Sequence, residues 1–275
     1  DKTETQYEML KRLELSVDAH RDLIAYCAKR NIIFMSTPFE ENSADLLDNL
    51  GVPIFKIPSG EINNVPFLTY VAQMGKPIIL STGMSHLGEV ELAVQTVRKT
   101  GNQELVLLHC VSNYPADALD VNLRAMQTMA VAFGCPVGYS DHTQGIEISL
   151  AAVALGACVI EKHFTLDRNL PGPDHEASLE PNELASLVAG IRNITSALGH
   201  GRKEPVANEI GSAAVIRKSL VAACDIPGGT VLNEKHIVIK RPGTGLLPTM
   251  HPFLVGRSTR IHISQGTLLA LEMLA

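Results

Sequence analysis

The sequence predicts an α/β fold of the (β/α)8 TIM-barrel type, followed by a small, mainly β domain. Over residues 1–200, short β-branched apolar runs alternate with amphipathic helical segments, as in a parallel sheet. The runs are almost continuously apolar, which is typical of strands buried on both faces. Most runs end in polar or small residues, and this favours a barrel that carries ligand residues at its strand ends. A doubly wound sheet is the alternative, but no GxGxxG or GxxxxGK[ST] motif occurs.

Six apolar runs predict strands, and they occupy residues 31–38, 54–60, 77–83, 105–112, 135–142 and 159–166. Amphipathic segments between and beyond them predict helices, which include residues 17–29, 44–50, 87–99, 146–155 and 181–198. Each strand-to-strand step is long enough for a helical crossover. Six strands are two fewer than a closed barrel needs.

The character of the chain changes after residue 200. Residues 201–213 are polar and contain glycine and proline, which predicts a linker between the barrel domain (1–200) and a second domain (214–275). In the second domain, short β-like runs at 219–223, 236–239 and 258–263 are separated by turn signals. A domain of this size is near the lower limit for independent folding.

The composition excludes several classes of protein. Lys and Arg number 23 against 29 Asp and Glu, which gives a formal charge of −6 without any long basic run. General binding to nucleic acid or to an anionic membrane is therefore not expected. The sequence has no apolar stretch of membrane-spanning length, and we expect its polar, helix-like first residues to form no signal peptide. Its five cysteines are scattered without CxxC pairs, so we expect reduced thiols in a cytoplasmic protein.

A buried lysine and a set of small hydroxyls suggest an anion pocket. Lys56 stands inside an apolar strand, where it either extends its amine to solvent or needs an anionic partner. Thr37, Ser59 and Ser81 follow near the ends of three successive predicted strands. Each is an ordinary turn residue when taken alone, but together they can surround a phosphate as neutral donors.

Histidines give a second signal. Three of them end or interrupt consecutive predicted strands, namely His109, His142 and His163. One such histidine is usually structural, whereas three at one rim favour a metal or acid–base site. Glu161 shares a strand face with His163 by alternation. Asp141 and Asp174 are candidates to orient the imidazoles or bind substrate hydroxyls, or else they cap helices.

Seven motifs stand in the order found in the sialic acid synthases. They are STPF (36–39), KIPSGEINN (56–64), PIILSTGM (77–84), LLHCVSNYP (107–115), GYSDHT (138–143), EKHFTLDR (161–168) and PGPDHEASLEP (171–181). The chain resembles this N-acetylneuraminate synthase group, which includes legionaminic acid and spore-coat polysaccharide relatives. The tail, with SLVAACDIPGGTVL and KRPGTG, resembles the antifreeze-like (SAF) domain that these enzymes carry.

The resemblance implies a transferase. It condenses phosphoenolpyruvate with N-acetylmannosamine or a related N-acylated hexosamine and water, and releases phosphate by C–O cleavage. A divalent ion, Mn²⁺ or Mg²⁺, is expected on His142 and His163, which count with Glu61 as the catalytic residues. The implied phosphoenolpyruvate contacts are Thr37, Lys56, Ser59, Ser81, Ser140 and, where some members have Asn, Ser112. The implied sugar contacts are Glu61, Tyr114 and Asp174. Arg241 corresponds to an arginine that enters the partner subunit's site in a domain-swapped homodimer.

One departure from the family pattern stands at the N-terminus. Members begin with a Glu in a first strand and a Lys-x-Gln in a second, and this chain has neither. We therefore expect the barrel to lack its first two strands. A non-catalytic, degenerate barrel acting as a dimeric carbohydrate-binding or assembly protein is one alternative, but the retained Lys56, His142, His163 and Arg241 argue against it. A related 3-deoxy sugar-acid synthase is another, and the SAF-like tail disfavours it.

Overall fold

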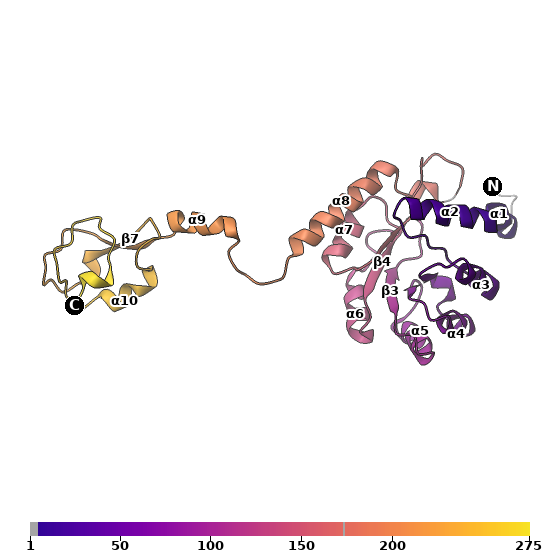
Figure 1. The fold of residues 1–275 in the computed structure, drawn as a ribbon, viewed down its shortest axis with the longest axis horizontal. Helices are drawn as coiled ribbons and strands as arrows, with labels where there is room; N and C mark the ends of the chain where they lie inside the picture. The colour runs from indigo at the N-terminus through magenta and orange to yellow at the C-terminus, as the bar shows by residue number, and fades with distance from the viewer. Residues whose placement is uncertain (1–4, 173) are drawn as a thin grey trace. The chain divides into compact units, whose positions relative to one another are not determined.

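The chain folds as two units, Asp1–Gly199 and His200–Ala275, in a computed structural model that describes residues 5–172 and 174–275 (Figure 1). Of the helices in these described residues, none has the length and apolar character needed to cross a lipid bilayer.

The first unit is built on a five-stranded parallel sheet in the order β1-β2-β3-β4-β5. The strands are β1 (Phe55–Ile57), β2 (Ile78–Ser81), β3 (Leu105–Cys110), β4 (Val137–Asp141) and β5 (Ile160–Lys162). Each strand pairs with the next along the chain, so the sheet curves as an open half-barrel rather than reversing its order. The predicted α/β class with a parallel sheet is confirmed, and the described residues of this unit form five of the six predicted strands.

Helices precede, connect and follow the strands, and those between the strands cover the outer face of the sheet (Figure 1). They are α1 (Gln6–Leu13), α2 (Val17–Lys29), α3 (Glu41–Asn49), α4 (Val65–Gln73), α5 (Leu87–Lys99), α6 (Arg124–Phe133), α7 (Glu147–Ala154) and α8 (Pro181–Leu198). Their ends follow local signals. Ser16 accepts a hydrogen bond from the Ala19 amide to cap α2, and Gly134 ends α6 in the left-handed conformation that glycine adopts without strain.

The main core lies between the sheet and these helices. Fully buried strand residues such as Phe55, Ile78, Leu107 and Tyr139 belong to the same cluster as Leu68 of α4. Burial of each such side chain stabilises the fold by about 1.5–3 kcal/mol. The outward side chains of the strands are thus committed to packing, which leaves the inward side chains free for other roles.

One predicted strand is wrong. Residues 31–38 lie outside the strands of the described structure, and Asn31 lies in the turn after α2 with a φ of 55°. Ile32 and Ile33 are 63% and 67% exposed, whereas Phe34 packs against the main core. An apolar run needs neighbours on both faces to be stable as a central strand.

The second unit contains α9 (Ala207–Ile216), an antiparallel pair of β6 (Ser219–Ala222) and β7 (Ile237–Lys240), and α10 (His251–Leu254). Its core includes Leu220, Ile226, Leu232 and Ile263. The predicted run at 258–263 forms isolated bridges, such as Ile226 with Ile263, instead of a strand. Helix α9 begins inside the segment 201–213 that the sequence predicted to be a linker.

Gly138 of β4 allows β4 and β5 to approach closely, so we expect Gly138→Ala to destabilise the protein. An added methyl group would lie 2.4 Å from the Val159 carbonyl oxygen and 2.7 Å from Leu108 Cδ2. Overpacking of this kind costs about 1–3 kcal/mol of unfolding free energy, which urea denaturation measures. Gly88→Ala in α5 is the control, because its methyl group would meet no atom within 4 Å. Equal stability of the Gly138 variant and the parent chain would contradict this account.

Candidate active site

The inward side chains at the carboxyl ends of the strands are polar. In parallel pairing, Cys110 stands opposite Ser140, and Ser140 stands opposite Glu161, so these three share the inner face. Lys56 lies on the same face of β1, and it lines a cavity of about 380 Å³ together with Thr37 and Glu161. Thr37 therefore reaches the predicted pocket although its segment forms no strand.

A short polar chain crosses this inner face. Lys56 Nζ lies 3.3 Å from Glu161 Oε2, and Ser140 Oγ donates a hydrogen bond of 2.6 Å to Glu161 Oε1. Lys56 is only 8% exposed. A cation buried to this degree needs a carboxylate or an anionic ligand close by, and it does not extend its amine to solvent as the alternative reading supposed.

Small donors gather beside this chain. The Gly83 amide donates to Ser59 Oγ at 2.9 Å, and Ser59 Oγ lies 3.2 Å from Cys110 Sγ, with Ser112 Oγ 4.0 Å beyond that sulfur. Ser81 Oγ is buried and has no hydrogen-bond partner among the described residues. A buried hydroxyl without a hydrogen-bond partner lowers the stability of the fold unless a ligand or a water molecule bonds to it.

Two of the three predicted histidines meet. The ring centroids of His142 and His163 are 5.5 Å apart, and the Tyr114 ring lies 4.2 Å from His142 and 5.5 Å from His163. His142 Nδ1 is 2.7 Å from the Val111 carbonyl oxygen. Because a carbonyl only accepts, Nδ1 carries the proton and Nε2 keeps its lone pair. Burial also lowers the pKa of His142, which favours the neutral imidazole that binds metal ions.

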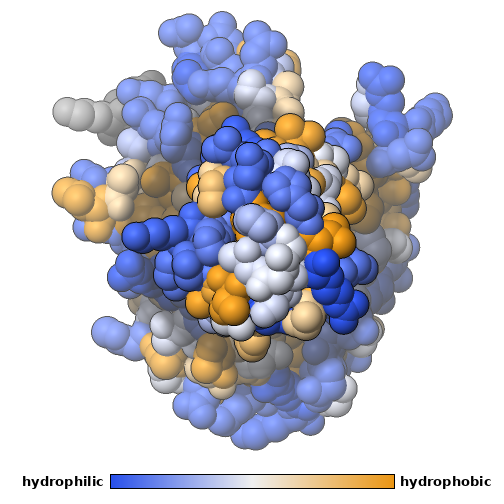
Figure 2. Space-filling view, turned by 90° about the vertical axis from the view of Figure 1, so that its left-hand side faces the viewer, coloured by the Kyte–Doolittle hydropathy of each residue, from blue (hydrophilic) through white to orange (hydrophobic). Residues whose placement is uncertain are grey.

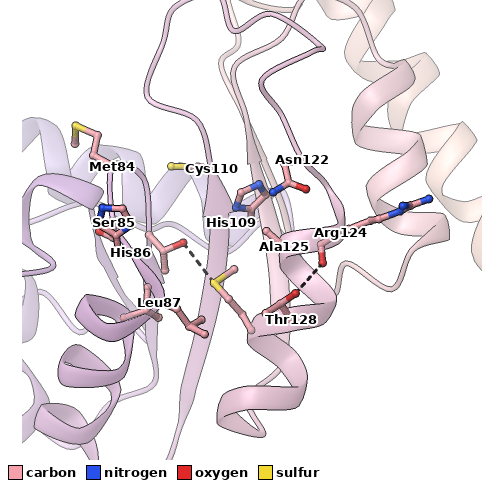
Figure 3. A pocket seen from close by; sticks show the side chains of 13 residues that line it. Met84, Ser85, His86, Leu87, His109, Cys110, Asn122, Arg124, Ala125 and Thr128 are labelled. Atoms are coloured by element: carbon pink, nitrogen blue, oxygen red, sulfur yellow. Dashed lines mark hydrogen bonds between the residues drawn. The ribbon is translucent and has the colours of Figure 1, made fainter.

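The prediction of a three-histidine rim is wrong for His109. Its Nε2 lies 2.6 Å from the Val121 carbonyl oxygen, and its ring packs 5.9 Å from Tyr139 in the outer core. Figure 3 shows it beside Asn122, in a separate cavity of about 480 Å³ that Leu87 and Thr128 also line. His109 thus has the structural role that a single strand histidine usually has.

Other predicted residues occupy the surroundings. Glu61 Oε2 accepts a hydrogen bond of 2.7 Å from Asn64 Nδ2 just after β1. Asp174 Oδ2 lies 3.9 Å from His163 Nδ1, and burial raises the pKa of Tyr114, so its hydroxyl stays protonated at neutral pH. Arg241 belongs to the second unit, where its Nε donates to the Ile216 carbonyl oxygen at 3.0 Å.

Sequence reasoning missed the central position of Glu161. It noted that Glu161 shares a face with His163 but left it out of the site, whereas the structure places it between Lys56 and Ser140. The signal was present, because an acidic residue two positions before an inward histidine must also point inward. Gly83 was missed for a different reason, since only the fold shows what surrounds a glycine.

The fold and this rim can now be compared with known proteins. Residues 1–203 match the sequence profile of the NeuB family. The chain belongs to the NeuB family. This confirms the resemblance to sialic acid synthases that the ordered motifs indicated.

Named relatives agree with this membership. The chain is 52% identical to the N,N'-diacetyllegionaminic acid synthase of Campylobacter jejuni, over 92% of this chain and 77% of the relative. It is 50% identical to the enzyme of the same name from Legionella pneumophila, over 98% and 76%. A crystal structure of the N-acetylneuraminic acid synthetase of Leptospira borgpetersenii, in complex with citrate, superimposes with a TM-score of 0.71 at 42% identity, covering 77% of this chain and 75% of that one. The chain is thus an enzyme of a synthase family.

Gly83 leads to a prediction about the site. An added methyl group would lie 2.4 Å from Ser112 Oγ, 2.7 Å from Cys110 Sγ and 2.8 Å from Ser59 Oγ. We expect Gly83→Ala to lower the unfolding free energy by about 1–3 kcal/mol, because three side chains must move together. Gly60→Ala, whose methyl group would meet nothing within 4 Å, should change it by less than about 0.5 kcal/mol. Denaturant unfolding of both variants is the measurement, and equal effects would contradict the crowding argument.

Proposed function

We propose that the chain condenses phosphoenolpyruvate with an N-acylated hexosamine and water to give a nonulosonic acid and phosphate. One observation carries this proposal. A Lys56–Glu161–Ser140 chain on the inner face of the half-barrel, in which Lys56 and Ser140 are buried and Glu161 is partly exposed, lies next to a pair of imidazoles packed edge to face. A pocket for an anion, next to two histidines of the kind that bind metal ions, suits a reaction between a phosphorylated donor substrate and an acceptor substrate with a carbonyl group. The names of the relatives reported above support the same reaction class.

The phosphate of phosphoenolpyruvate would bind near Lys56. Lys56 supplies the charge, while Ser59, Ser81 and the other small hydroxyls supply neutral donors. The orphan hydroxyl of Ser81 supports this placement, because a phosphate oxygen would give it a partner. The remaining hydroxyls proposed to contact phosphoenolpyruvate are those of Thr37, Ser112 and Ser140.

A divalent ion, Mn²⁺ or Mg²⁺, would be held by His142 and His163. The donor set fits an open site, because His142 Nε2 carries a lone pair, with Ser140 Oγ 3.5 Å away, and the two rings lie edge to face with centroids 5.5 Å apart. Among the described residues, no group of three or more His, Cys, Asp or Glu side chains forms a metal site. Two protein ligands would leave coordination positions for substrate oxygens and water. When bound, the ion would polarise the aldehyde of the open-chain sugar.

The chain's own residues would then position the reactants. C3 of phosphoenolpyruvate attacks the aldehyde carbon of the sugar, and the aldehyde oxygen takes up a proton. Water adds at C2 and gives up a proton, and the bond between C2 and the phosphate oxygen then breaks to release inorganic phosphate. Glu61 would orient the sugar or the water, and Tyr114 and Asp174 would bind the sugar beside His163. We further propose that Arg241 of a swapped homodimer holds the N-acyl end of the sugar, with residues 214–275 as the SAF-type domain that carries it and residues 1–200 as the barrel domain.

The acceptor is proposed to be a deoxy-diacetamido hexose instead of N-acetylmannosamine. The two relatives at 52% and 50% identity are both named N,N'-diacetyllegionaminic acid synthase. The structurally characterised N-acetylneuraminic acid synthetase is 42% identical. The higher identity thus lies with relatives whose named product carries two N-acetyl groups.

An acceptor panel tests this function. We expect the protein, supplied with Mn²⁺ and phosphoenolpyruvate, to release phosphate at least about tenfold faster with the diacetamido hexose than with N-acetylmannosamine, a difference of about 1.4 kcal/mol in transition-state stabilisation. Mass spectrometry identifies the nonulosonic product. Equal phosphate release with a five-carbon sugar phosphate would contradict the proposal. Faster release with N-acetylmannosamine would overturn only the choice of acceptor.

Metal binding gives an independent prediction. We expect His142→Ala to raise the dissociation constant for Mn²⁺ at least tenfold, since one of two protein ligands is lost, which corresponds to about 1.4 kcal/mol or more. Electron paramagnetic resonance of free Mn²⁺ measures this without turnover. His86→Ala is the control, because His86 is exposed and precedes α5. Unchanged Mn²⁺ affinity in the His142 variant would refute the assignment of the histidine pair.

A further inference from the structure

A buried ion pair lies directly behind the histidine pair. Lys162 Nζ is 2.9 Å from Asp141 Oδ2, and their side chains are 4% and 0% exposed. Asp141 immediately precedes His142, and Lys162 immediately precedes His163. Because successive strand residues point to opposite faces, the ion pair lies on the outer face of the sheet while the imidazoles lie on the inner face.

The Asp141 carboxylate has its acceptor positions filled. Oδ1 accepts hydrogen bonds from the amide and the hydroxyl of Thr143 at 2.9 and 2.8 Å. Oδ2 accepts from Ser149 Oγ at 2.5 Å and from Lys162 Nζ at 2.9 Å. Lys162 also donates to the Thr143 carbonyl oxygen at 2.5 Å. One carboxylate thus ties together the end of β4, the turn after it, helix α7 and the end of β5.

The pair stands where the strand ladder ends. The last paired residues of β4 and β5 are Asp141 and Lys162 themselves. His142 and His163 follow one residue later, beyond the paired registers. The side chains of these last paired residues are thus bonded to each other across the strands, one residue before the imidazoles, while the Ser140–Glu161 hydrogen bond joins the same two strands on the inner face.

Stability alone does not account for such a pair. Replacing a buried ion pair by neutral groups of similar shape is often neutral or stabilising, because both charges must be removed from water. Metal ligands, in contrast, must be held within a few tenths of an ångström, and partners behind the ligands tune metal affinity by about tenfold to a hundredfold.

We infer that Asp141 and Lys162 are positioning residues that set the separation and orientation of the His142 and His163 imidazoles. This inference rests on the proposed function, because it assigns these imidazoles to the metal of that reaction. The sequence left open whether Asp141 orients an imidazole, binds a substrate hydroxyl or caps a helix, and this inference selects the first of these roles. Asp141 acts from the opposite face, through the backbone that it shares with His142.

The test is the double variant Asp141→Asn/Lys162→Met, which removes both charges and keeps the approximate shape. We expect its thermal unfolding midpoint to stay within a few degrees of that of the parent chain, while its dissociation constant for Mn²⁺ rises by about tenfold to a hundredfold. The matched control is Asp48→Asn/Lys76→Met. It removes the same two charges from a more exposed pair, with 2.6 Å between Lys76 Nζ and Asp48 Oδ1, and its Mn²⁺ affinity should not change.

Ring NMR on the metal-free protein separates this inference from the proposed function. With histidine rings labelled, we expect the nuclear Overhauser contact between His142 and His163 to weaken or vanish in the double variant and to persist in the control. If the parent chain binds no Mn²⁺, the metal part of the proposed function fails, and the ring contact still decides whether the ion pair positions the imidazoles.

Two results overturn the inference. One is a folded double variant whose ring contact and Mn²⁺ affinity match those of the parent chain. The other comes from the Ser149→Ala variant, which replaces the double variant if that one does not fold. It removes only one hydrogen bond from Asp141. We expect it to weaken Mn²⁺ binding about twofold to fivefold and to reduce the ring contact, and an unchanged ring contact would overturn the inference.

Discussion

Parallel pairing brings the carboxyl ends of five strands to one rim, and the rest of the structure depends on this constraint. Each strand contributes only one or two inward side chains at that rim. Residues that are far apart in sequence, such as Lys56 and Glu161, thereby come within 3.3 Å of each other. The site needs no long loop to assemble it, because the backbone ladders already fix the spacing.

The two faces of the sheet have different tasks. The outer face packs apolar side chains such as Tyr139 and Leu107 against the helices, and this packing makes the strands rigid. The inner face carries the groups assigned to chemistry. The Asp141–Lys162 pair is the exception, since it places two charged side chains in the outer layer. The pair lies at the end of the β4–β5 pairing, where each of its members is followed by a histidine. The outer layer and the inner site are thus connected through the backbone of residues 141–142 and 162–163.

Much of the fold follows from the sequence because apolar runs and amphipathic periods are local signals. The bounds predicted for α2, α5 and α8 agree with the structure. The failures have a common physical origin. In a strand buried on both faces, periodicity tells which residues share a face but not which face is the inner one. For this reason the sequence left the direction of Asp141 open and placed His109 at the rim. The run at 31–38 shows the other limit, because burial depends on neighbours that the run itself does not specify. The roles of the rim residues came from the resemblance to a family and not from the pattern.

The central claim is that the inner rim of the half-barrel binds phosphoenolpyruvate beside a metal ion held by His142 and His163. A crystal structure of the chain with phosphoenolpyruvate and Mn²⁺ tests it most directly. The account predicts a phosphoryl group within hydrogen-bond reach of Lys56 Nζ and Ser81 Oγ, and an ion with anomalous scattering between the two imidazoles at about 2–2.3 Å. Phosphoenolpyruvate bound instead in the cavity beside His109 and Asn122, or Mn²⁺ bound away from both imidazoles, would contradict it.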